Sequence, residues 1–523
     1  MKNQEINKER LAQWQSSLYY EDVPHTPESD QEHPSIPGSK VVPIQQLIDD
    51  NLPSVPSNEL DQLFERLNQR DDWSNFPSSA HSTITSRPRN ETAIAHLQRL
   101  YGQVMGEIGQ IGQSHSSLEA SPENLIKAYG RRHRRLTLAT PDAGLILSDG
   151  TRHHAELDME NRNTLLMYLP IVFKPGTSIF ERQTNSESKA SGKIARTMWR
   201  IMNDDPRRRF VFGLAFDNAI ARLYFTSRTK ALVSTPFEMY KDWHILVRIF
   251  VALGKAQDRA DLGYDDTISV VQDERGCRVF DVSMDNAMFR IANSLSYGSP
   301  DATRMWAVRE VREGKAAGPY LRLKDHWPPY PRPPEHENIQ RLKDLLQGDT
   351  RCVHLPGVRA AEFVPRSRDR TQIAMDITEN PSTPHTEHVT QSKSTWQGGA
   401  SCLRAQYRIV YEEMGISMAD VKTLDTALSG LQGALCGRIE ALHEVGWLHR
   451  NINPRSILLV HRDSDHRCSK SQCEPNGHVA VLINFEHAIE DNDDKDHNDF
   501  RTNTWQFMAS EVMTTYWNLS PDP

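Results

Sequence analysis

The stretch GWLHRNINPRSILL, residues 446–459, holds polar residues at a spacing suited to group transfer. His449 and Arg450 are followed by Asn451, and Ser456 comes five residues after Asn451. Proton transfer in such chemistry usually needs a carboxylate or an imidazole, and the neutral amide of Asn451 is not a useful base near pH 7.

A second polar group lies in LINFEHA, residues 482–488. Asn484 offers a neutral amide oxygen, and Mg²⁺ prefers carboxylate and phosphate oxygens to an amide oxygen. Glu486 follows two residues later and would point to the same side as Asn484 in an extended segment. Two interpretations of Glu486 stay open, a substitute metal ligand and a solvated loop residue, and the second is favoured.

These residues need strands and helices to position them, and the sequence pattern predicts such elements. Two strands are expected at 303–311 and 319–327, and a helix is expected at 334–347, where a proline suits the first turn. A buried strand is expected at 406–415. Apolar residues then recur at steps of three and four, which predicts one amphipathic helix. They are Leu428, Leu431, Leu435, Ile439 and Leu442.

In this order the segments resemble the fungal-type protein kinase family. The matching segments are RRFVFGLAFDNAIARLYF, YLRLKDHW, YRIVYEEMG, GWLHRNINPRSILL, LINFEHA and RTNTWQFMASEV, which fall within roughly residues 140–513. The resemblance implies that Lys324 holds nucleotide phosphates and pairs with a helix glutamate. For that partner Glu337 is favoured, with Glu335 as the alternative.

The resemblance also assigns the remaining positions of a kinase site. It implies a hinge of Glu412, Glu413 and Met414 whose backbone binds adenine. The catalytic-loop positions are His449, Arg450, Asn451 and Ser456, with Asn451 at the position of the base and Ser456 at one metal position. Asn484 is the other metal position, and Glu511 ends the activation segment. Only Gly298 remains of the glycine-rich loop.

Because the base and both metal positions are replaced, ATP remains a candidate ligand while the residue set argues against Mg²⁺. Two functions stay open. One is a pseudokinase or interaction scaffold, which is favoured, and the other is an active ATP-dependent serine/threonine kinase. The chain ends eleven residues after Val512, which predicts an incomplete C-lobe. The apolar stripe would then be partly uncovered, and an unknown protein partner is expected on the 426–445 helix.

Composition limits the other classes of partner. With 61 basic and 69 acidic residues, the net charge of −8 makes a nucleic-acid partner unlikely. The N-terminus has no apolar signal region. The longest apolar stretch, 165–173, is too short to span a membrane and is expected as a buried strand. These features predict an intracellular protein, cytoplasmic or nuclear, with no membrane contact.

The expected fold class is α+β. Residues 1–90 are rich in polar residues and proline, so they are expected to be mostly disordered. An α/β module is expected at 91–294. A kinase-like N-lobe follows at 295–415, with a disordered insertion at 366–400. A truncated kinase-like C-lobe is expected at 416–523.

Overall fold

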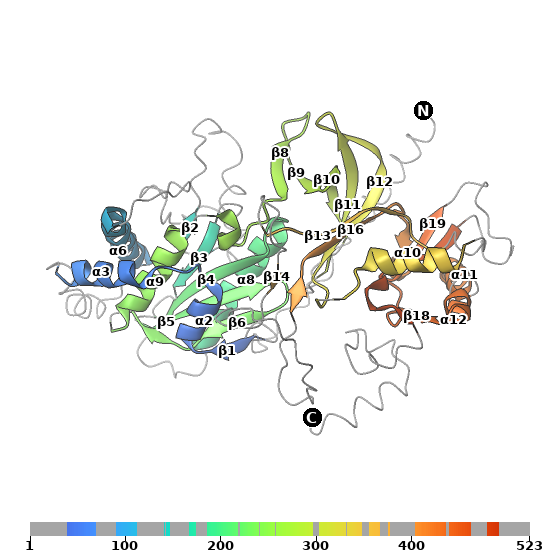
Figure 1. Ribbon diagram of the computed structural model, residues 1–523. Helices are drawn as coiled ribbons and strands as arrows, with labels where there is room; N and C mark the ends of the chain where they lie inside the picture. The colour runs from blue at the N-terminus through green and yellow to red at the C-terminus, as the bar shows by residue number, and fades with distance from the viewer. Residues whose placement is uncertain are drawn as a thin grey trace, which may run out of the picture.

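The computed structural model describes sixteen stretches of the chain. They are residues 39–69, 90–111, 141, 143–146, 167–173, 186–217, 220–239, 241–256, 258–295, 303–330, 332–347, 355–366, 375–376, 403–435, 439–461 and 478–490. Figure 1 shows a first sheet with its helices at one end of the molecule, a second sheet in the middle, and the C-terminal elements at the other end.

The first sheet is mixed and seven-stranded, in the order β1-β6-β5-β4-β3-β2, with β7 paired to β5. Its strands are β1 (Lys40–Val42), β2 (Ala143–Ile146), β3 (Met167–Phe173), β4 (Phe210–Asp217), β5 (Ile220–Ser227), β6 (Ala231–Ser234) and β7 (Phe237–Glu238). Every residue of β3 is buried, as expected for the longest apolar stretch. Its neighbour β4 is parallel to it, while β2 is antiparallel.

Helices cover both faces of this sheet. One face packs on α2 (Ile44–Asn51), α3 (Ser57–Asn68), α6 (Asn90–Ile111) and α9 (Trp243–Gly254), and the other packs on α8 (Ser186–Asp204). Gly213 lets α8 approach β4 closely, because a Cβ there would lie 2.6 Å from the Met198 sulfur. The first module is therefore a three-layer α/β unit.

The prediction that residues 1–90 are mostly disordered is wrong for the described part, 39–69. Strand β1 pairs with β6, and α3 buries Leu63 and Leu67 completely. Leu60, Leu63 and Leu67 recur at helical spacing within a polar sequence, so an average over the whole segment hides a local amphipathic helix. The other residues before Asn90 lie outside the described part of the chain.

The second sheet is antiparallel, in the order β13-β16-β12-β11-β10-β9-β8. Its strands are β8 (Ile268–Gln272), β9 (Arg278–Met284), β10 (Ala287–Ser294), β11 (Arg304–Arg312), β12 (Lys315–His326), β13 (Val358–Phe363) and β16 (Tyr407–Tyr411). The helix α10 (Glu335–Leu345) lies between β12 and β13 in the chain and packs on the face that carries Tyr407 and Tyr411. The strands and the helix expected around Lys324 are thus present.

The expected boundary between residues 294 and 295 is incorrect. Strand β10 pairs with β11, with Phe289 opposite Glu310, so β8, β9 and β10 belong to the second sheet. The polar connection after β10 joins two neighbouring strands of one sheet and does not separate two domains.

The C-terminal elements form two small sheets, one ordered β17-β19-β20 and one pairing β18 with β21. The strands are β17 (Ile416–Ser417), β18 (Trp447–Leu448), β19 (Ile457–His461), β20 (His478–Leu482) and β21 (Ile489–Glu490). The helices are α11 (Leu424–Ala434) and α12 (Glu440–Glu444). Two further short strands, β14 (Met375–Asp376) and β15 (Arg404–Ala405), pair with each other. The 3-10 turns are η2 (Arg259–Leu262), which precedes β8, and η4 (Met418–Asp420) and η9 (Phe485–His487) among the C-terminal elements.

The expected amphipathic helix is present as two helices, α11 and α12. Gly430 faces the small sheet, since a Cβ there would lie 2.6 Å from Leu459. Leu442 is buried, whereas Leu428, Leu431 and Leu435 are 57%, 44% and 46% exposed. The apolar stripe is therefore divided between a buried end and an exposed face.

Some expectations concern residues outside the described part of the chain. These are Gly298, most of the 366–400 insertion, and the segment after residue 490 with Glu511. Within the described stretches, the helices are too short or too polar to cross a membrane.

Candidate functional site

Lys324 is fully enclosed where β12 faces α10. Its amino group lies 2.9 Å from a carboxylate oxygen of Glu335 and is also ion-paired with Glu486. Burial alone would lower the pKa of Lys324, but the two carboxylates outweigh that effect and raise the pKa above its ordinary value. The lysine is therefore charged, and two acidic side chains from different segments hold it.

Glu335 is the central acceptor of the site. One of its oxygens binds Lys324, and the other accepts a 2.7 Å hydrogen bond from the Phe485 backbone N–H and a short one from the Tyr411 hydroxyl. Burial raises the pKa of Glu335, while Lys324 opposes that rise. One carboxylate thus ties together β12, β16, α10 and the segment that begins η9.

The expected pairing of Lys324 with Glu337 is wrong, and the alternative, Glu335, makes the contact. Glu337 is exposed on the opposite side of the helix. Successive helical residues are rotated by about 100°, so positions 335 and 337 point in nearly opposite directions. Because Glu335 is the first residue of α10, the direction of the helix entry decides which glutamate faces β12.

The catalytic-loop positions follow β18 and form a closed hydrogen-bond set around Asn453. The Ser456 hydroxyl donates to the Asn453 carbonyl at 2.8 Å and accepts from the Asn453 N–H at 2.9 Å. The Asn453 side-chain amide donates to the Asn451 side-chain oxygen at 3.0 Å. Asn453 was not predicted as a site residue, although its place between Asn451 and Ser456 in the quoted motif is a usable signal.

His449 joins this loop to the segment that carries Asn484. Its Nε2 lies 3.1 Å from the Ile483 carbonyl, and its Nδ1 accepts from the Asn451 N–H at 3.3 Å. The ring packs edge-on against Phe485, with centroids 4.7 Å apart. Burial lowers the pKa of His449 to about 4, so the ring is neutral and donates through Nε2. The adjacent Arg450 has a left-handed backbone conformation, with φ of 63°.

Asn484 and Glu486 differ from their expected arrangement. The segment is not extended, because Asn484 has φ of 72° and Glu486 lies in η9. Glu486 is not a solvated loop residue, since its side chain is 14% exposed and ion-paired with Lys324. The Asn484 side-chain oxygen is buried and has no hydrogen-bond partner among the described residues.

The donor set at this place is a poor match for Mg²⁺. An octahedral magnesium site is usually built on one or two carboxylates together with phosphate oxygens and waters. Here Asn484 supplies one neutral oxygen, and Glu486 is already ion-paired with Lys324. The Ser456 hydroxyl is used within its own loop. Across the described stretches, no group of three or more His, Cys, Asp or Glu side chains is arranged to hold a metal ion.

The expected hinge, Glu412 to Met414, is hydrogen-bonded to Gly357 in the loop before β13. The Glu412 N–H donates to the Gly357 carbonyl at 2.9 Å, and the buried Glu413 carboxylate accepts from the Gly357 N–H at 2.9 and 3.0 Å. Met414 follows, partly exposed, and leads through Gly415 into β17. The hinge positions therefore join the second sheet to the C-terminal elements, as expected.

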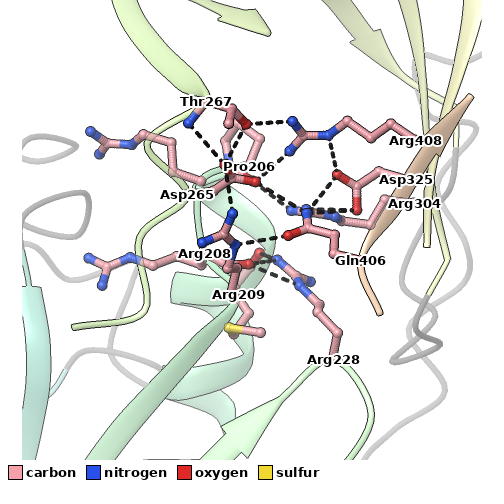
Figure 2. Close-up of polar contacts among 12 residues, drawn as sticks. Pro206, Arg208, Arg209, Arg228, Asp265, Thr267, Arg304, Asp325, Gln406 and Arg408 are labelled. Carbon is pink, nitrogen blue, oxygen red and sulfur yellow. Dashed lines mark hydrogen bonds and ion pairs between the residues drawn. The ribbon is translucent and has the colours of Figure 1, made fainter. Parts of the chain in front are cut away.

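A second polar cluster, the junction network, lies where the first module meets the second sheet (Figure 2). Asp325 accepts from Arg408 at 2.7 Å and from Gln406 at 3.0 Å, and it lies 3.2 Å from Arg304. Asp265, just before β8, is ion-paired with Arg408 and lies 3.2 Å from Arg209. Burial alone would raise the pKa of Asp325, but the guanidinium groups outweigh it and lower the pKa.

Hydrogen bonds in the junction network run in both directions between the first module and the second sheet. Arg209 of the first module donates to the Gln406 side chain at 2.8 Å, and Arg304 of β11 donates to the Pro206 carbonyl of the first module at 2.6 Å. The sequence analysis did not identify this network. The available signal was charge inside predicted strands, Asp325 in YLRLKDHW and Arg408 in YRIVYEEMG.

Comparison with known proteins gives one family. The family described as Fungal protein kinase matches residues 175–519. No curated protein matches the chain. A crystal structure of the BubR1 kinase domain is similar at 13% sequence identity, with a TM-score of 0.28. The match covers 45% of this chain and 57% of the BubR1 chain.

Proposed function

Because the chain belongs to the fungal protein kinase family, we propose that it is a kinase-like protein that does not transfer phosphate and acts by binding a protein partner. The observation that carries this proposal is the closed loop around Asn453. The position of the base holds the neutral Asn451, and the Ser456 hydroxyl is bonded within the loop in both directions. Neither side chain is arranged to receive a substrate proton or a metal ion.

The state of Lys324 supports the same proposal. A lysine that binds phosphates needs one carboxylate to orient it, and Glu335 supplies that contact. Glu486 places a second carboxylate beside Lys324, where nucleotide phosphates would have to bind. Repulsion between Glu486 and the phosphates would weaken binding unless a cation lies between them.

The competing function is an ATP-dependent serine/threonine kinase. The buried Lys324–Glu335 ion pair favours it, because this pair is a requirement of protein-kinase catalysis. Against it, loss of a general base alone lowers the rate by about 10²–10⁴-fold. Replacement of both metal positions in the same catalytic unit would lower the rate further.

Labelled-ATP incorporation separates the two functions. The full chain, incubated with generic serine/threonine substrates and with itself, is expected to show no more incorporation than Lys324→Ala. The matched control is the triple variant Asn451→Asp, Ser456→Asn, Asn484→Asp, which restores two carboxylates and the metal-binding amide. Incorporation by the natural chain that disappears in Lys324→Ala would overturn the proposal.

The proposed partner surface is the exposed face of α11. Leu424, Leu428, Leu431 and Leu435 are 44–75% exposed and recur at steps of four and three, so they share one face. The opposite face is buried through Gly430, Gly433 and Ala434. An apolar helix face of this kind is typical of a protein–protein contact.

A further inference from the structure

Arg322 lies on β12, two residues before Lys324. Side chains alternate along a strand, so positions 322 and 324 point to the same side and lie about 7 Å apart. Lys324 marks the phosphate end of the expected nucleotide site. Arg322 pairs in register with Tyr411, the residue immediately before the hinge, and so marks the end where the base would bind.

The guanidinium of Arg322 extends to Gly415, the residue that follows the hinge. Its Nη2 donates to the Gly415 carbonyl at 2.9 Å, and its Nη1 contacts the Met305 sulfur at 3.7 Å. Gly415 is closely packed against β19, since a Cβ there would lie 2.7 Å from the Leu459 carbonyl oxygen. The side chain therefore spans the distance from the second sheet to the entry of the C-terminal elements.

This arrangement does not favour stability. Arg322 is 5% exposed, and its Nε has no hydrogen-bond partner among the described residues. Burial lowers the pKa of Arg322 to about 10, although Tyr411 and Asp420 act in the opposite direction. A buried, incompletely bonded guanidinium is unfavourable, so packing alone gives no reason for an arginine here.

We propose that the buried Arg322 side chain occupies the place beside the hinge where adenine would bind, and so excludes the base. This inference rests on the proposed function, because it explains how a kinase-like chain remains inactive even where Lys324 and Glu335 are paired. The Arg322 guanidinium is held against the carbonyl of Gly415, the residue that follows the hinge, so it lies where a purine beside the hinge would have to enter. At the other end of the expected site, Glu486 lies beside Lys324.

Equilibrium binding of adenosine, and of ATP with a chelator, to the full chain tests this proposal. Adenosine carries no phosphate, so its binding reports on the base site alone. The natural chain is expected to bind neither, and Arg322→Ala is expected to bind both at least about tenfold more tightly, the factor that corresponds to 1.4 kcal/mol. Arg309→Ala, which removes a half-exposed arginine from the neighbouring β11, is expected to behave like the natural chain.

A second variant covers the case in which Arg322→Ala fails to fold. Arg322→Met keeps the unbranched apolar part of the side chain and removes the hydrogen bond to Gly415, and it is expected to bind adenosine more tightly than the natural chain. Adenosine binding by the natural chain with the affinity of a folded variant would overturn the inference, as would no gain in either folded variant. Loss of ATP binding in the variants would also overturn it, because it would make Arg322 an anion ligand. Phosphate transfer is a separate readout. Transfer by the natural chain would overturn both the proposed function and this inference, whereas adenosine binding without transfer would overturn this inference alone.

Discussion

Replacement of Asp325 by asparagine should destabilise the whole chain, because it removes one of the carboxylates that neutralise the junction network. Both oxygens of Asp325 face donors, with Arg408 and Gln406 at one and Arg304 and Gln406 at the other. Either orientation of an asparagine amide would place its NH₂ group against a donor. Removal of one partner from a buried ion pair destabilises a protein by about 3–5 kcal/mol.

Urea unfolding followed by tryptophan fluorescence measures this effect. Trp306 and Trp327 lie beside the Arg304 guanidinium, with ring centroids 4.7 and 5.7 Å away, so their emission reports on the network. With an m-value of about 2–3 kcal/mol per M, the midpoint should fall by roughly 1–2.5 M. Adding Arg408→Met should recover part of the loss, because the two residues are in contact.

The matched control for this experiment is Glu274→Gln. Glu274 belongs to an exposed pair with Lys315, so the midpoint should change little. If Asp325→Asn shifted the midpoint no further than Glu274→Gln, the guanidinium groups would have other compensation, and the argument from buried charge would be wrong.

Two further perturbations test other parts of the structure. Burial raises the pKa of Glu362 to about 7, so between about pH 4.3, its ordinary pKa, and pH 7 the folded state keeps a proton that the unfolded state has lost. The free energy of unfolding should therefore fall as pH rises through this window, and Glu362→Gln should remove that fall. If the natural chain and Glu362→Gln differed in free energy of unfolding by the same amount at about pH 5 and about pH 7.5, this prediction would be wrong. On α11, the double variant Leu428→Glu, Leu431→Glu should keep the melting temperature of the natural chain, whereas Leu442→Ala, at a buried position, should cost about 2–5 kcal/mol. Comparable destabilisation by both would show that the exposed face is needed for folding.

The elements around Lys324 could be predicted from sequence because local patterns specify them. The strands and the helix that follow Lys324 each show their own periodicity, and their order identifies the family. The choice between Glu335 and Glu337 could not be made in this way. Both lie in the first turn of α10, and the direction in which the chain enters the helix decides which one faces Lys324. That direction depends on tertiary packing of the helix, which no local pattern encodes.

Arg322 shows how a local pattern can be correct and still leave the function open. Alternation in LRLKD places Arg322 and Lys324 on one face and Leu321, Leu323 and Asp325 on the other. An arginine on the polar face of a strand is usually exposed, so the pattern gives no sign that its guanidinium turns toward Gly415. The burial of Arg322 and its hydrogen bond to Gly415 show that this face is covered.

Lys324 and Asp325 are neighbours in sequence, yet partners from different parts of the chain neutralise them. Lys324 is held by α10 and η9, and Asp325 is held by β11 and β16 beside the first module. Side chains alternate along a strand, so Lys324 and Asp325 point to opposite faces of the sheet. Both are buried, and each therefore needs groups of opposite charge on its own face. The sequence KD in a buried strand therefore contains a prediction of its own. It requires cations on the face opposite α10, and Arg304 of β11 and Arg408 of β16 supply them beside the first module.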